Sequence, residues 1–109
     1  MISYVRFKEI FDALDADREP EIELYFQSRK NTYMIIKYSD FITFQRCGTI
    51  EEQSGEIRFN TLDELYNART IDDIVLKNEW NDLYDILFDC TFSVVTDPDE
   101  LCSQYGISI

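Results

Sequence analysis

The chain has 109 residues and a formal net charge of −12, and 45% of its residues are apolar and 15% aromatic. This length fits one domain, spanning residues 1–109, and the apolar content is too high for a disordered chain. The excess of acid argues against binding to nucleic acid or to an anionic membrane, because both attract positive charge. The N-terminal sequence MISYVRFKEIF lacks the pattern of a signal peptide. We therefore expect a cytoplasmic protein with no nucleic-acid or membrane partner.

The residue types needed for common catalytic and metal sites are scarce. The chain has no histidine, so the commonest general base is missing, and it has no glycine-rich phosphate loop. Cys47, Cys90 and Cys102 are odd in number and lack metal-binding spacing. We expect no cofactor and no catalytic or metal-ligating residue, and hence a protein that is not an enzyme. A carboxylate-metal enzyme is the third and least favoured alternative.

The first element predicted along the chain is a helix over Tyr4 to Ala16. Phe7, Ile10, Phe11 and Leu14 follow the i, i+3, i+4, i+7 pattern of an apolar helix face. Ser3 is a suitable N-cap. The polar segment DADREP should end this helix, because a residue that precedes proline avoids the α conformation.

The next segment, EIELYFQS, closely resembles the cleavage site of a plant-virus protease used to trim purification tags. However, the apolar residues alternate with polar ones over Glu21–Gln27, which indicates a strand with one buried face. After a four-residue polar break, Thr32–Tyr38 is rich in β-branched and aromatic residues. The two runs predict a hairpin. Phe41–Arg46 and Glu56–Phe59 are the third and fourth predicted strands, and sequential strands usually pair.

The second half of the chain is predicted to be mainly helical. TLDE, beginning at Thr61, is a capping box that should start a helix over Leu62–Ala68. Lys77–Phe88 is predicted as a helix whose apolar stripe includes Trp80. Phe92–Val95 is a candidate final strand, and DPDE at Asp97 predicts a last helix that ends before Gly106.

These elements predict an α+β fold. It consists of an N-terminal helix, a three- to four-stranded antiparallel meander, and C-terminal helices packed on one sheet face.

The order EIELYF, Y-x-I, F-x-T-L-D-E-L and W-x-x-L, over residues 21–87, resembles small acidic α+β proteins of Gram-positive bacteria and their mobile elements. Most of those proteins are uncharacterised. In size and charge the chain is also similar to immunity proteins that neutralise secreted toxins. The resemblance implies a bacterial, cytosolic, non-enzymatic protein, and it transfers no functional residue.

We expect an acidic binding protein of the inhibitor or immunity type that neutralises a basic protein partner. The second hypothesis is a structural or regulatory domain that acts through homodimerisation, for instance by edge-strand pairing. The predicted binding residues are acids on the far side of the Lys77–Phe88 helix and two strand tyrosines. They are Glu79, Asp82, Asp85, Asp89, Tyr25 and Tyr38.

Overall fold

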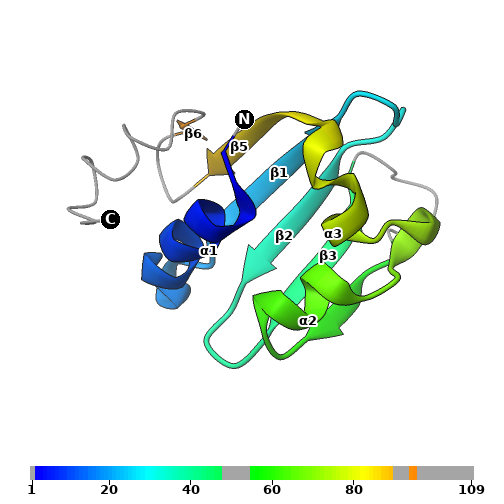
Figure 1. The fold of residues 1–109 in the computed structure, drawn as a ribbon. Helices are drawn as coiled ribbons and strands as arrows, with labels where there is room; N and C mark the ends of the chain where they lie inside the picture. Colours follow the sequence, from blue (N-terminus) through cyan, green and yellow to red (C-terminus); the bar gives the residue numbers. More distant parts are fainter. Residues whose placement is uncertain (1, 48–54, 90–93, 96–109) are drawn as a thin grey trace.

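A computed structural model describes residues 2–47, 55–89 and 94–95, and it shows an α+β fold with one sheet. The three α-helices lie on the same side of this sheet (Figure 1). In chain order the elements are α1 (Tyr4–Ala13), η1 (Ala16–Arg18), β1 (Glu21–Phe26), β2 (Tyr33–Lys37), β3 (Ile42–Arg46), β4 (Ile57–Phe59), α2 (Leu62–Asn67), η2 (Ile71–Asp73), α3 (Leu76–Glu79), η3 (Trp80–Asp82), β5 (Leu83–Asp89) and β6 (Val94–Val95).

Among the described residues, the sheet has six strands in the order β4-β3-β2-β1-β5-β6, and all neighbouring pairs are antiparallel. The predicted meander is confirmed as β1 to β4, since each of these strands pairs with the next. β5 returns to the free edge of β1, where Ile22 lies opposite Phe88 and Leu24 opposite Ile86. β1 therefore lies inside the sheet, between β2 and β5.

Alternation along β1 assigns the two faces of the sheet. Ile22, Leu24 and Phe26 are at most 2% exposed, whereas Glu21, Glu23 and Tyr25 are half-buried. The first three residues belong to one apolar core that also includes residues of all three α-helices. Burial of each such side chain contributes roughly 1.5–3 kcal/mol. The strand interpretation of EIELYFQS and the hairpin with β2 are confirmed.

Helix α1 has the predicted N-cap and a C-terminal cap that the sequence did not suggest. The Ser3 hydroxyl accepts a hydrogen bond from the Arg6 amide at 3.2 Å. At the other end, the Lys37 Nζ atom donates to the carbonyls of Phe11 (2.6 Å), Asp12 (3.1 Å) and Leu14 (2.9 Å). The last carbonyls of a helix lack i+4 partners, and here only the Phe11 carbonyl also accepts from the Leu14 amide, so a cation from β2 helps to satisfy the helix end. The helix ends at Ala13, three residues before the predicted boundary.

Helix α2 begins as the capping box predicts. The Thr61 hydroxyl accepts from the Glu64 amide at 3.2 Å. The Glu64 carboxylate reaches one residue further back than expected and accepts from the Asn60 amide at 3.1 Å. The cap therefore joins α2 to the end of β4.

The predicted helix over Lys77–Phe88 is wrong. Helix α3 ends at Glu79, a short 3-10 turn follows, and residues from Leu83 onward form strand β5. The apolar residues after Trp80 fit both a helical stripe and a strand with one bulge, so the pattern was ambiguous. Pairing with β1 favours the strand over the helix. It buries Ile86 and Phe88 in the core and supplies hydrogen-bond partners for backbone groups of both strands.

The core assignment of Trp80 is confirmed, since this side chain is 6% exposed. Its Nε1 atom donates to the Ile2 carbonyl at 2.9 Å, and its ring meets Tyr4 and Phe7 edge-on. The predicted final strand is present as Val94–Val95, opposite Phe88 and Asp89. The predicted helix after Asp97 lies outside the described residues. Among those residues, no helix is both long and apolar enough to cross a bilayer.

Candidate functional site on the outer face of the sheet

The side of the sheet that faces away from the helices, here called the outer face, carries Tyr25, Asp85 and Asp89, three of the six predicted binding residues. Its membership follows from strand alternation and register. It comprises Glu21, Glu23, Tyr25, Met34, Ile36, Thr43, Gln45, Arg58, Asp85, Leu87 and Asp89. Ile36 and Thr43 are buried, whereas the residues of β1 and β5 are at least partly accessible. Met34, Gln45 and Arg58 are also at least partly accessible, but the acidic residues of the outer face all lie on β1 and β5.

These two strands place acidic side chains on neighbouring positions. Asp89 lies opposite Glu21, and Asp85 lies opposite Tyr25, while Glu23 follows Glu21 on the same face. The pKa of Glu21 is raised above its usual value, chiefly by burial and then by the charges of Asp89, Glu23 and Glu19. Like charges on paired strands destabilise a sheet. The folded state thus holds several carboxylates close together, and their mutual repulsion lowers the stability of the sheet.

The acidic strip is defined here as Glu21, Glu23, Asp85 and Asp89 on β1 and β5. An irregularity in the β1–β5 pairing places an exposed aromatic ring beside this strip. Tyr25 pairs with Asp85, but Phe26 pairs with Leu83, so Tyr84 is the extra residue of a bulge. Tyr84 is 57% exposed, and its ring centroid lies 6.1 Å from that of Tyr25. The Tyr25 hydroxyl donates to Glu23 at 2.9 Å, and burial together with this bond raises the pKa of Tyr25 to about 12.

A second aromatic group lies at the turn between β2 and β3. The rings of Tyr38 and Phe41 stack with centroids 4.8 Å apart. The guanidinium of Arg58 lies over the Phe41 ring, 3.6 Å from its centroid. Burial, followed by the charges of Glu19, Glu56 and Glu21, raises the pKa of Tyr38. Tyr25, Asp85 and Asp89 belong to the outer face, and Arg58 of the same face contacts the Phe41 ring on which Tyr38 stacks.

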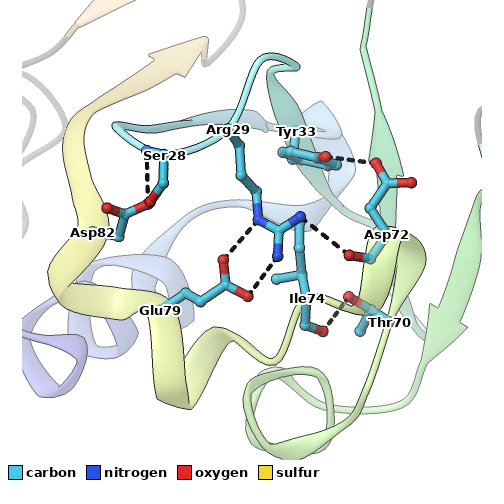
Figure 2. Close-up of polar contacts among 8 residues, drawn as sticks. All are labelled: Ser28, Arg29, Tyr33, Thr70, Asp72, Ile74, Glu79 and Asp82. Atoms are coloured by element: carbon cyan, nitrogen blue, oxygen red, sulfur yellow. Dashed lines mark hydrogen bonds and ion pairs between the residues drawn. The ribbon is translucent and has the colours of Figure 1, made fainter.

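Glu79 and Asp82 do not belong to this face, because both bind the turn between β1 and β2 (Figure 2). Glu79 accepts two hydrogen bonds from Arg29, at 2.7 and 2.8 Å. Asp82 accepts from the amide and the hydroxyl of Ser28, at 3.0 and 2.5 Å. These bonds lower the pKa of Asp82. The shared helix face predicted for Glu79, Asp82 and Asp89 does not exist, since these residues lie on three different elements.

Sequence reasoning missed Asp72, which completes this network. Its carboxylate accepts from the Tyr33 hydroxyl at 2.6 Å, and its carbonyl accepts from Arg29 at 3.1 Å (Figure 2). The Asp72 carboxylate also accepts from Arg46 at 3.1 Å. Its backbone is left-handed, with φ of 56°. A pair of adjacent aspartates was the only local signal, and such pairs are common in an acidic chain. These contacts hold the segment that precedes α3 against the sheet.

A hollow of about 400 Å³ lies between α1, the β2–β3 turn and the start of α2. Two lysines line it, but both are already engaged. Lys8 pairs with Asp63 at 2.7 Å, and Lys37 caps α1. The hydrogen bonds from Lys8 and Tyr4 lower the pKa of Asp63. The charges of this hollow therefore stabilise the fold.

The structure offers little for metal or thiol chemistry in its described part. No group of three or more His, Cys, Asp or Glu residues among residues 2–47, 55–89 and 94–95 is arranged to hold a metal ion. Burial, followed by the charges of Glu23 and Glu21, raises the pKa of Cys47 to about 11. A thiol with a raised pKa is a poor nucleophile at neutral pH.

Comparisons with protein-family models, curated proteins and solved structures found no match for this chain. The fold and the outer face therefore carry the functional argument. They define an α+β protein whose sheet has helices on one side and an acidic, tyrosine-bearing strip on the other.

Proposed function

We propose that this chain is a non-enzymatic binding protein that recognises a basic protein partner through the outer face of its sheet. The observation that carries the proposal is the strip formed by β1 and β5. Within the part of the chain that the structure describes, neither Glu23 nor Asp85 forms an ion pair, and Tyr84 stands exposed beside them. An inhibitor or immunity-type role in a bacterial cytoplasm agrees with this surface and with the resemblance given above.

The net charge of −12 supports this function kinetically. A strongly acidic protein attracts a basic partner over distances up to about the Debye length, roughly 10 Å at 0.1 M salt. Such steering raises the association rate and is lost as salt increases. Tyrosine rings then supply contact area at low entropic cost. The outer face combines both features.

The test compares two triple variants that remove the same amount of charge. In the first, Glu21→Gln, Glu23→Gln and Asp85→Asn neutralise the strip. In the control, Glu9→Gln, Asp17→Asn and Asp73→Asn neutralise exposed acids elsewhere. Proteins captured from a bacterial lysate at low salt are identified, and their association kinetics are measured against each variant.

We expect the strip variant to associate more slowly than the control and with a weaker dependence on salt. Equal rates for the two variants would show that the acidic strip only keeps the protein soluble. Circular dichroism of each variant establishes that any difference arises from the surface and not from unfolding.

Homodimerisation through an edge strand is the second candidate. In the described residues, β6 pairs with β5 only at Phe88 and Asp89, so the outer edge of β5 from Leu83 to Leu87 has no strand partner there. Unpaired strand edges favour association. The edge at β4 is only three residues long and is less suitable. Light scattering distinguishes the two functions, because a dimer that persists over a wide concentration range would favour this second one.

A further inference from the structure

We propose that the Tyr25–Tyr84 pair, with Glu23 and Asp85 beside it, binds an arginine side chain of the partner in preference to a lysine. This inference deepens the proposed function and rests on it. It assigns a specific chemistry to one end of the outer face, where the proposed function requires only a basic partner.

The two rings and the two carboxylates lie within one small region of the sheet. Tyr25 and Asp85 are directly opposite each other, and Tyr84 is the bulge residue next to Asp85. The rings are inclined at 54° with centroids 6.1 Å apart. Glu23 is held beside Tyr25 by the hydrogen bond from the tyrosine hydroxyl. A planar cation placed on the exposed Tyr84 ring would therefore lie close to carboxylate oxygens.

The same molecule already holds an arginine against aromatic rings at the β2–β3 turn. There Arg58 lies over Phe41, which stacks on Tyr38. At the Tyr25–Tyr84 pair, no lysine or arginine of the described residues makes a cation–π contact. A partner arginine would reproduce at Tyr84 the arrangement that the chain makes for itself with Arg58.

The chemistry of the pair favours guanidinium over ammonium. Arginine is planar, stacks on aromatic faces and presents several donors that match a carboxylate. Lysine is a compact, strongly hydrated charge that gains less from a ring. Loss of a whole cation–π contact at an exposed site lowers affinity by about two- to fivefold, and lysine retains part of this contact, so the preference for arginine should be at most about fivefold.

The probes are two capped peptides of equal length and charge, one alternating glycine with arginine and the other glycine with lysine. Each is titrated into the isotope-labelled full chain, and the amide signals of Tyr25, Tyr84 and Asp85 are followed by NMR. We expect the arginine peptide to shift these signals at a lower concentration than the lysine peptide, by a factor of up to about five.

Substitutions at Tyr84 separate the ring from the charge. Tyr84→Phe should keep the preference for arginine, and Tyr84→Ser should abolish it. Val5→Ser is the matched control, because Val5 is a similarly exposed apolar residue on α1, 67% exposed. Equal responses to the two peptides, no response at these signals, or a preference that survives Tyr84→Ser would overturn the inference. A third outcome is that the two peptides give equal responses and that both responses disappear in the variant carrying Glu21→Gln, Glu23→Gln and Asp85→Asn. That outcome would refute the preference for arginine but would still support the proposed function.

Discussion

The guanidinium of Arg29 joins the turn between β1 and β2 to two separate segments of the chain. It pairs with Glu79 at the end of α3 and donates to the Asp72 carbonyl in η2. The side chains of Arg29 and Glu79 are only 24% and 23% exposed, so their attraction is screened less than that of a surface pair. One residue thus fixes the place of the segment that leads into β5.

We predict that Arg29→Met lowers the free energy of unfolding by about 1–3 kcal/mol, because it leaves a partly buried Glu79 carboxylate without its charged donor. Lys30→Met is the control, since Lys30 is exposed on the same turn. It should change stability by less than about 0.5 kcal/mol. Urea unfolding of both variants gives the comparison. Equal losses would contradict the assigned role of Arg29.

A second residue-scale prediction concerns the register of β1. Leu24 is fully buried, so Leu24→Asp should abolish the native state, because an unpaired carboxylate in the core costs several kcal/mol. Tyr25→Asp, on the outer face, should leave a folded protein with a smaller loss of stability. Urea melts followed by circular dichroism measure both. The reverse order would require a strand shifted by one residue.

At the scale of elements, strand β1 has neighbours on both sides. Its backbone pairs with β2 over Glu21–Leu24 and with β5 over Glu21–Phe26. A protease that binds EIELYFQS needs this segment extended and free. We predict that the tag-trimming protease cleaves after Gln27 slowly or not at all in the native protein and rapidly in the denatured chain. Gel electrophoresis over a time course measures this, and fast native cleavage would show that the hairpin opens readily.

The acidic strip on β1 and β5 should make stability depend on pH. Because the pKa of Glu21 is raised in the folded state, the fold binds this proton more tightly than the unfolded chain, whose value is near 4.5. The contribution of Glu21 to the free energy of unfolding is therefore complete below the pKa of the unfolded chain. It is lost as the pH rises through the raised pKa of the folded state.

We therefore predict that Glu21→Gln raises the melting temperature at pH 7 and has no stabilising effect at or below about pH 4. Thermal unfolding measured across this range tests the prediction. Glu9→Gln, at an exposed position of α1, is the control and should show no such trend. A gain that is equal at both pH values would point to a cause other than ionisation.

At the scale of the whole molecule, one core joins the helices to the sheet. Trp80, the single tryptophan, contacts α1 and donates to Ile2, which is distant in sequence. We predict that its fluorescence and the far-ultraviolet circular dichroism signal change together during urea unfolding, as expected of a single cooperative domain. Separate transitions would mean that the sheet and the helices unfold independently.

Local chemistry determined much of this architecture. The Ser3 cap, the Thr61 capping box and the alternation around Leu24 each depend on neighbouring residues only, so the sequence predicted the start of α1, the start of α2 and the buried face of β1. The resemblance to small acidic bacterial proteins and the expected function remain predictions. In the candidate site, the sequence indicated Tyr25, Asp85 and Asp89, but it did not indicate that they share one face.

Contacts between distant segments determined the structure where the local sequence pattern was compatible with both a helix and a strand. The residues from Trp80 to Phe88 satisfy a helical and a bulged-strand pattern about equally, and the free edge of β1 selects the strand. That pairing moves Asp85 and Asp89 beside Tyr25 and Glu21, whereas Glu79 and Asp82 bind the Arg29 turn. The physical reason is that hydrogen bonding and burial between segments distant in sequence outweigh local propensity, and only the folded chain brings those segments together.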